Sequence, residues 1–448
     1  MGTMPVPRLL ISMSLPMILS MLVQALYNIV DSIFVAMYDP VAGTAALTIA
    51  FPIQNLMIAV ATGLGVGMNA LISRSLGEKR FDRANSIAGQ GFLLTFCGYL
   101  IFLVLGLFFV PPYVSTQSSS NALIQQYGSE YLRIVCIGCI AIFIEITCER
   151  LLQATGRTTL SMITQMAGAI TNIILDPIMI FTLDMGIAGA AIATVIGQAV
   201  SAILGIIFNL TCNKELSLRP SILIPRARLL TEILAIGIPS VLMQAIGSVM
   251  TYCMNKVLIS FPDCGVSAMN VFGIYFKLQS FIFMPIFGMN NGMVPIIAYN
   301  YGARKRDRVM KTIRLAMILA VSYMLLGLAA FQLFPAQLLG IFNADVMMLE
   351  IGTVALRRIS LSFIFAGFCI ITLTVCQALG KSVYSLITSI GRQLVVLIPT
   401  AVLFSLSGNV NLVWLAFPIA EIVSVILATF FMLRVLKKLL PKDLTPNT

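Results

Sequence analysis

The chain has 448 residues, of which 59% are hydrophobic and only 10% charged, and its mean hydropathy is +0.99. This composition lies far outside the range of soluble globular proteins and predicts an integral membrane protein. The formal net charge of +11 would suggest nucleic-acid binding in a soluble protein, but the basic residues lie in short connections between apolar segments, where they act as orientation signals. We therefore expect a lipid bilayer around the chain and no nucleic-acid partner.

The residue types that are missing exclude several kinds of chemistry. There is no histidine, so proton chemistry would have to run on the 17 acidic residues. The GKS triplet at 380–382 lacks the upstream glycine of a phosphate-binding loop, because position 375 is valine. We expect neither an enzyme nor an ATP-driven pump, and no cofactor.

Twelve apolar segments are long enough to cross a bilayer, which needs about 20 residues per helix. The first six are expected near 8–36, 44–73, 84–110, 128–149, 158–181 and 186–211. The other six are expected near 229–260, 267–299, 310–334, 350–377, 382–405 and 410–436. The fold class is therefore all-α and transmembrane.

The connections between these spans alternate in charge. Those after the odd-numbered spans contain no Lys or Arg, whereas the alternate connections are basic. Because basic loops stay in the cytoplasm, both termini are expected to be cytoplasmic in a multi-pass protein of the inner (plasma) membrane.

The two halves of the chain repeat each other. LQATGRTTLSMIT at 152–164 corresponds to CQALGKSVYSLIT at 376–388, and Pro16 and Pro177 correspond to Pro239 and Pro399. An even number of spans per repeat leaves both repeats in the same orientation, with a cleft between them, as in secondary transporters that rock. We expect an N-lobe over 1–211, a cytoplasmic linker over 212–228 and a C-lobe over 229–448, in a monomer.

The N-terminal half places polar residues on three of its spans. Span one carries a stripe at the spacing of one helical face, formed by Gln24, Tyr27, Asn28 and Asp31. Spans five and six carry Asn172 with Asp176 and Thr194 with Gln198, in each case four residues apart. Charges inside a bilayer are costly, so such residues normally face the bundle interior.

Asp31, Asp176 and Thr194 are expected at similar depths, given the rise of a helix. Two carboxylates, an amide and a hydroxyl at one depth can hold Na⁺ with hard oxygen ligands, or a proton between crowded acids. Pro177 removes an N–H and opens the carbonyl of Ile173, which adds a possible oxygen ligand. The alternative is that these groups only hydrogen-bond across the bundle, a role as plausible as ligand binding for Gln24, Asn28 and Gln198.

The second half differs. Met254 stands where the first half has Asp31, and no acid occurs within 233–262 or 351–381. Arg392 and Glu421 are expected to form a structural ion pair, with a substrate contact as the alternative, while Lys256 and Lys277 either snorkel outward or line the cleft. Glu145 is expected to pair with a local base.

Spans seven and eight are rich in methionine and phenylalanine. Their flexible thioethers and aromatic faces could accept apolar cations of many shapes, although lipid contact or packing is the better explanation for most of them. The candidates for such a surface are Met254, Met269, Phe272 and Phe276.

These motifs together resemble the MATE (multidrug and toxic compound extrusion) family, in its bacterial DinF-like or MepA-like branch rather than the NorM-like one. The resemblance rests on YNIVDSIFV in span one, TNIILDPIMIF in span five, GIAGAAIATVIGQ in span six and the paired loops GEKR and GARKR. It implies a V-shaped fold of two six-helix lobes related by a pseudo-two-fold axis. It also implies a cation site at Asp31, Asn172, Asp176 and Thr194, whereas the C-lobe acids of the NorM-like branch are absent.

The resemblance implies export of organic, often cationic, compounds coupled to inward H⁺ or Na⁺, with span one bending near Pro16 and span five at Pro177. A flippase for lipid-linked sugars is the alternative, and a strongly cationic cavity would support it. A receptor or channel would act without an ion gradient, and the internal repeat disfavours it. Sequence leaves open the drug spectrum, the choice of ion and the role of Arg392 and Glu421.

Overall fold

The computed structural model describes residues 1–39, 41–117, 122–217, 224–342 and 345–440, and all regular elements in these ranges are helices. The first half contains α1 (Val6–Tyr38), α2 (Ala42–Gly77), α3 (Phe81–Val104), η1 (Leu105–Phe109), α4 (Val110–Gln117), α5 (Ala122–Gly138), α6 (Ile140–Ala154), α7 (Thr158–Pro177), η2 (Ile178–Thr182) and α8 (Gly186–Thr211). The second half contains α9 (Ala227–Ile259), α10 (Gly265–Gly302), α11 (Arg306–Leu333), α12 (Pro335–Gly340), α13 (Val346–Ser360), α14 (Phe363–Ala378), α15 (Ser382–Ile390), η4 (Gly391–Leu397), α16 (Ile398–Ser405), α17 (Val410–Val413) and α18 (Ala416–Leu439).

These helices form twelve apolar spans. Within the described ranges, ten segments are long and apolar enough to cross a membrane, and two further spans are bent pairs. The pairs α5–α6 and α13–α14 bend by 45° and 47°. They occupy equivalent places in the two repeats, which fits the predicted internal symmetry.

The third span extends further than predicted. It was expected to end at residue 110, before two prolines, but the helix continues to Gln117. The π-helical turn η1 precedes Pro111 and Pro112, so both prolines fall in the first turn of α4. The helix is continuous here, so each proline removes an N–H from it, and a local π-helical turn is one way in which a membrane helix re-satisfies the carbonyl groups that this frees.

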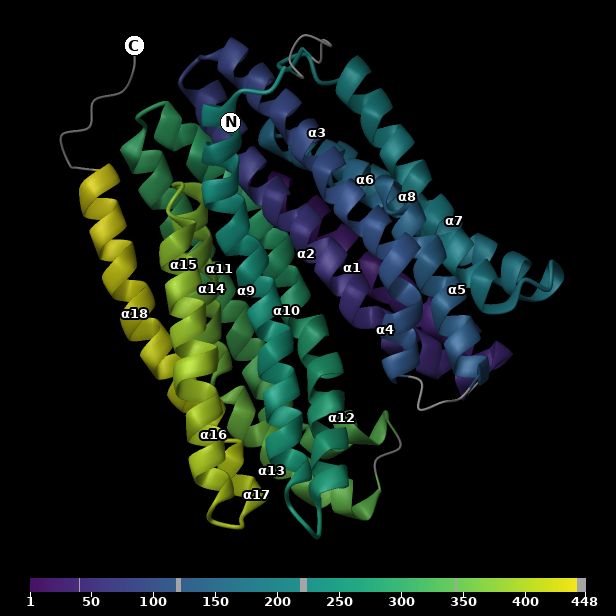
Figure 1. Ribbon diagram of the computed structural model, residues 1–448. Helices are drawn as coiled ribbons and strands as arrows, with labels where there is room; N and C mark the ends of the chain where they lie inside the picture. Colours follow the sequence, from purple (N-terminus) through teal and green to yellow (C-terminus); the bar gives the residue numbers. More distant parts are fainter. Residues whose placement is uncertain (40, 118–121, 218–223, 343–344, 441–448) are drawn as a thin grey trace.

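The helices form a V of two lobes (Figure 1). Helices α1–α8 make one arm and α9–α18 the other, and the arms diverge away from the N-terminus. The end that carries Met1 and Leu440 is called here the terminal end. The boundaries predicted for the lobes and linker remain a prediction, and Pro220 of that linker lies outside the described residues.

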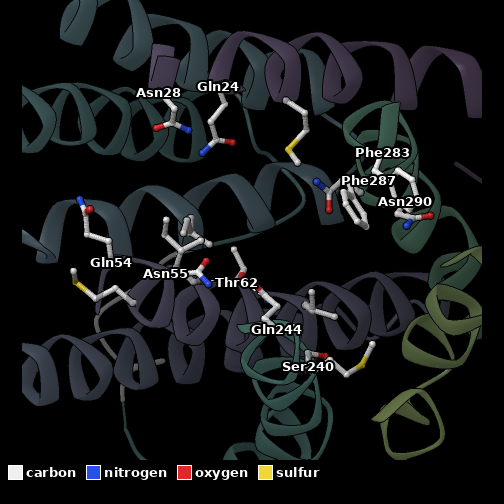
Figure 2. Close-up of a pocket in the computed structure, with 18 of the residues that line it drawn as sticks. Gln24, Asn28, Gln54, Asn55, Thr62, Ser240, Gln244, Phe283, Phe287 and Asn290 are labelled. Carbon is white, nitrogen blue, oxygen red and sulfur yellow. Dashed lines mark hydrogen bonds between the residues drawn. The ribbon is translucent and has the colours of Figure 1, made fainter. Parts of the chain in front are cut away.

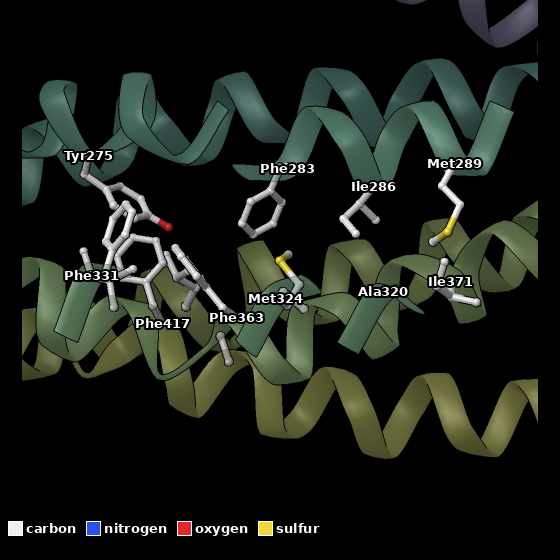
Figure 3. Close-up of a cluster of buried hydrophobic side chains, with 14 of the residues drawn as sticks. Tyr275, Phe283, Ile286, Met289, Ala320, Met324, Phe331, Phe363, Ile371 and Phe417 are labelled. Atoms are coloured by element: carbon white, nitrogen blue, oxygen red, sulfur yellow. The ribbon is translucent and has the colours of Figure 1, made fainter. Parts of the chain in front are cut away.

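The C-lobe packs around aromatic and methionine side chains of α10, α11, α14 and α18 (Figure 3). Phe363 lies 5.4 Å from Phe283 and 5.1 Å from Phe331, measured between ring centroids, in edge-to-face geometry. Met324, beside the Phe283 and Phe363 rings, is fully buried and fills a gap that rigid rings leave. This core holds α10 in place along one wall of the space between the lobes.

The lobes meet through glycines at equivalent positions of the repeats. Gly63 and Gly67 of α2 lie against α9, and Gly288 and Gly292 of α10 lie against α1. Residues 63 and 288, like 67 and 292, are 225 apart in the sequence. The missing side chains let the helix backbones of opposite lobes approach closely, which produces two pseudo-symmetric contacts.

A third glycine pair closes the terminal end. A Cβ atom at Gly77 would overlap the carbonyl oxygen of Tyr299, and one at Gly302 would overlap the carbonyl oxygen of Arg74. Residues 77 and 302 are again 225 apart. Around this contact, Arg83 of α3 pairs with Glu232 of α9 at 2.6 Å.

The N-terminal segment is fastened beside the same contact. The Arg308 guanidinium donates to the carbonyl oxygens of Met1 (3.0 Å) and Met4 (2.6 Å), and the Lys305 ammonium donates to that of Gly2 (2.9 Å). Burial and the nearby charge of Arg308 lower the pKa of the Met1 amino group, which reduces its repulsion with these cations. Arg306 likewise donates to the carbonyl of Leu440, so both ends of the described chain meet the α10–α11 turn.

Candidate cation and substrate site

A cavity of about 960 Å³ lies between the two lobes. Its wall is rich in amide side chains that project from helices of both lobes, among them Gln24, Asn28, Gln54, Asn55, Gln244 and Asn290 (Figure 2). Two bonds bridge the lobes across α2 and α9, from Gln244 to the Thr62 hydroxyl (2.8 Å) and from Asn55 to the Ser248 hydroxyl (3.2 Å). The volume suits a drug-sized molecule, and the amides offer it both donors and acceptors.

The charged side chains on this wall are mostly acidic. The acids are Asp31, Glu145, Glu149 and Glu421, and the bases are Arg150 and Arg392. The described wall therefore carries more negative than positive groups. A cavity of this sign attracts cations and raises the cost of admitting an anion.

The predicted ligands on spans five and six come together at the cavity wall, which Asn172 and Thr194 line while Asp176 lies deeper. Asn172 and Asp176 of α7 are buried, at 2% and 0% exposure, and Thr194 of α8 is 8% exposed. The Asn172 amide is satisfied at both ends when its nitrogen donates to Asp176 Oδ2 (3.2 Å) and its oxygen accepts from the Thr194 backbone N–H (3.2 Å). The three residues are thus one connected group.

Asp31 completes this group from α1. Its carboxyl group lies within hydrogen-bonding reach of that of Asp176, and its Oδ1 is buried without a partner among the described residues. Asp31 lines the cavity, whereas Asp176 lies deeper. Two carboxyl groups in contact cannot both be charged unless a cation lies between them; without a cation, the pair holds a proton.

Glycines bring α7 and α8 close enough to form the group. A Cβ atom at Gly168 would lie 2.7 Å from the Gly197 carbonyl oxygen, and one at Gly197 would lie 2.8 Å from that of Gly168. Only glycine permits this approach, which places Thr194 one turn from Gly197 beside Asn172.

Pro177 ends the regular part of α7. The π-helical turn η2 follows it, and the Leu183 N–H bonds back to the Ile178 carbonyl at 2.8 Å. Since proline has no N–H, the carbonyl of Ile173 loses its usual partner next to Asp176. π-helical turns occur frequently at functional sites.

The residues proposed for the cleft divide into two sets. Gln24, Tyr27, Asn28, Gln198 and Phe276 line the cavity. Met254, Met269 and Phe272 are not among the lining residues, so their predicted cleft positions are wrong. Met254 and Phe272 are buried in the C-lobe core instead, where the Phe272 ring lies 4.7 Å from that of Phe276.

The predicted pair of Arg392 and Glu421 is present, with Arg392 Nη1 donating to Glu421 Oε1. Glu421 is 6% exposed, and both residues lie on the cavity wall. Lys256 and Lys277 are exposed, outside the lining, and lie 5.8 Å from the rings of Tyr252 and Phe342.

Breaking this pair should destabilise the C-lobe. Arg392→Met leaves the Glu421 charge buried without a partner and should lower the free energy of unfolding by about 3 kcal/mol, and Glu421→Gln should lower it less because Arg392 is partly exposed. The double variant removes both charges and should recover most of that loss. Equilibrium unfolding in mixed micelles measures all three variants, and a double variant no more stable than the single ones would contradict a purely structural pair.

Glu145 does not pair with a local base, contrary to expectation. No ion pair of Glu145 is found in the described ranges, and its charged neighbour is Glu149, one turn further along α6. Glu149 and Arg150 were not predicted as site residues, yet both line the cavity. Arg150 crosses to the other lobe, where it donates to Asn291 at 2.9 Å.

Within the described ranges, no three His, Cys, Asp or Glu side chains come close enough together to hold a metal ion. A sodium ion at Asp31 and Asp176 would therefore need the amide, hydroxyl or carbonyl oxygens beside them.

The MatE family model matches residues 16–178 and 239–403, which is most of the chain and corresponds to the two repeats. The chain belongs to the MATE family. The predicted family and V-shaped, twelve-span fold are confirmed.

Among curated proteins, this MATE chain is similar to the multidrug export protein MepA of Staphylococcus haemolyticus, at 28% identity over 93% of this chain and 91% of the relative. It is 26% identical to MepA of Staphylococcus aureus strain MRSA252, over 92% and 90%. These similarities support the predicted MepA-like branch.

Solved structures show the same fold. A multidrug resistance MATE family transporter of the MOP superfamily, in an outward-facing conformation, superposes with a TM-score of 0.88 at 26% identity, covering 96% of each chain. A MOP superfamily transporter from Pyrococcus furiosus superposes with a TM-score of 0.89 at 25% identity, covering 97% and 96%. Its description reports a binding pocket of reverse polarity that suggests a different function. Pocket charge can therefore differ between proteins of this fold, and the cavity of this chain has to be judged on its own residues.

Proposed function

We propose that this chain is a secondary active exporter that releases organic, often cationic, compounds from the cell in exchange for inward H⁺ or Na⁺. The observation that carries the proposal is the excess of acidic over basic side chains on the wall of a drug-sized cavity between two lobes. The MepA relatives, which are named as multidrug export proteins, support the same substrate class.

The coupling ion is assigned to Asp31, Asn172, Asp176 and Thr194. Asp31 faces the cavity and has an unpartnered oxygen, whereas Asp176 is buried and connected to Asn172. A proton or Na⁺ that enters from the cavity would meet Asp31 first and would reduce the repulsion between the carboxylates of Asp31 and Asp176. This binding step changes the charge between α1 and α7, and α1 also contacts the opposite lobe at α10.

Transport then follows from two states of the V. With the termini in the cytoplasm, the closed terminal end makes this conformation outward-facing. Ion binding at Asp31 would bend α1 near Pro16 and disfavour the drug-bound state, so the drug leaves outward. Drug and ion need no direct contact. Each binds the inward-facing and outward-facing conformations with different affinity, and each therefore shifts the equilibrium between these two conformations.

A flippase for lipid-linked sugars is the second candidate. Such substrates carry phosphate groups, which a strongly cationic cavity would bind. The described wall has two arginines against four acids, and one of these arginines is paired with Glu421. This distribution of charge favours cations as the substrate.

The test uses proteoliposomes loaded with a fluorescent organic cation, with a Na⁺ gradient or a pH gradient imposed separately. Efflux driven by one gradient alone would support antiport and identify the ion. If neither gradient drives efflux while the folded protein still binds the dye, the exporter proposal fails and lipid-linked substrates become the next assay.

A further inference from the structure

Two glutamates of α6 face the cavity one helical turn apart. Glu145 and Glu149 both line it, and Glu149 is 5% exposed. Residues four apart occupy the same face of a helix, where like charges repel. Inside a membrane protein two adjacent carboxylates need a positive partner, because burial removes the water that would otherwise stabilise them.

The chain itself offers little compensation. Arg150 follows Glu149 in the sequence and acts on it electrostatically, but its Nη1 donates to Gln153 (3.0 Å) and Asn291 (2.9 Å). Among the described residues, no Lys or Arg lies within 4.0 Å of either carboxylate. The Glu145 carboxyl group has the Ser201 hydroxyl as its polar neighbour.

Hydrogen-bond acceptors are in excess around this pair. Glu149 Oε2 accepts from the Gln165 amide at 2.6 Å, but Glu149 Oε1 is buried with no donor among the described residues. The amide oxygens of Gln165 and Gln198 are buried and unsatisfied in the same way, and all three side chains line the cavity. Leaving buried acceptors unpaired is costly, so a ligand that donates hydrogen bonds here would bind favourably.

This location is distinct from that of the aspartates. Glu149 lies five residues from the end of α6 at Ala154, whereas Asp176 lies near the far end of α7, which starts at Thr158. Gln165, which is bonded to Glu149, precedes Asp176 by eleven residues on α7, so a rise of 1.5 Å per residue separates Glu149 from Asp176 by about 16 Å along the lobe. Gln198 lies between them on α8, one turn after Thr194.

We infer that Glu145 and Glu149, with the amide oxygen of Gln165, bind the positively charged, N–H-bearing part of the exported compound. This inference rests on the proposed export function and assigns the substrate a place separate from the coupling ion. An organic cation suits the site because it supplies several N–H donors at once, while Ile142 and Ile146 on the same wall can contact its apolar body. Drug and ion then bind the same lobe at different depths.

The test measures binding of ethidium to the full-length protein in detergent by fluorescence polarisation, with Nile red as an uncharged dye of comparable size. Glu149→Gln should raise the Kd for ethidium at least tenfold, and Glu145→Gln should raise it in the same direction. The Kd for Nile red should stay unchanged in both. Glu130→Gln, an exposed change on α5, is the matched control and should leave both values at those of the wild type.

Thermal unfolding separates binding from folding. Without ligand, Glu149→Gln should melt at or above the wild-type Tm, because it removes a repulsion, while the stabilisation by ethidium is lost. If Glu149→Gln does not fold, the Kd of Glu145→Gln decides. An unchanged ethidium Kd in the folded variants would overturn the inference. It would also be overturned if Glu149→Gln lost its stabilisation by Na⁺ but kept its stabilisation by ethidium.

The two proposals can fail independently. If ethidium binds through these glutamates but no ion gradient drives its efflux, the export function fails. If efflux persists and Glu149→Gln binds ethidium like the wild type, the substrate site fails and export stands.

Discussion

Asp31→Asn and Asp176→Asn should each reduce gradient-driven efflux to the rate of protein-free liposomes. Either change removes a carboxylate from the only close acid pair formed by α1 and α7 in the described part of the chain, so a proton or Na⁺ no longer has a site whose occupancy depends on the state of the lobes. Asparagine keeps the size of the side chain, so the protein should still fold. Dye efflux from proteoliposomes and the Tm in detergent measure both outcomes.

Asp263→Asn is the matched control, since Asp263 is exposed in the connection between α9 and α10. It should leave efflux and Tm unchanged. Asp31→Asn should still bind ethidium, because the substrate site is assigned to α6, but its ethidium Kd should change less with the coupling ion than that of the wild type. Coupled efflux retained in both aspartate variants would contradict the assignment of the ion site.

Gly77→Ala and Gly302→Ala should open the terminal end. Each added Cβ atom overlaps a backbone carbonyl of the opposite lobe, which cannot rotate away as a side chain can. Overpacking of about 3 kcal/mol shifts a two-state equilibrium roughly 100-fold. Distances between spin labels placed across the terminal end should therefore lengthen in both variants, and export should fall because the outward-facing state is depleted.

Gly273→Ala is the control for helix propensity, because it lies on α10 like Gly302 but has open space around its Cβ position. It should leave the distances unchanged. The pseudo-symmetry of the contact further predicts that Gly77→Ala and Gly302→Ala act in the same direction. Unchanged distances in both would show that this glycine contact does not control closure.

The spans could be predicted because membrane thickness fixes their length and hydropathy shows it directly. The grouping of Asn172 with Asp176 and of Thr194 with Gln198 followed from helical spacing in an apolar background, where each polar residue stands out. The bends after Gly138 and Ser360 could not be predicted from these patterns, because they interrupt a span without lowering its hydropathy.

Two features of the site depended on information that hydropathy lacks. Glu145 was predicted to pair with a local base, but Arg150 on the same helix lies five residues further along, on a different face, and reaches across to Asn291 instead. Met254 lies in a helix that is apolar on all sides, so no pattern separated its core-facing side from the side facing the cavity. Packing against the other helices decided both positions.

The central claim is that this protein moves the drug and the coupling ion across the membrane in opposite directions, in one coupled cycle. Its most direct test imposes only a gradient of ethidium on proteoliposomes and records movement of radioactive sodium, or of protons with a pH-sensitive dye. The proposal predicts that one ion moves against the direction of ethidium, and that Asp31→Asn abolishes this ion flux. Ethidium transport by the wild-type protein without any opposing flux of either ion would contradict it.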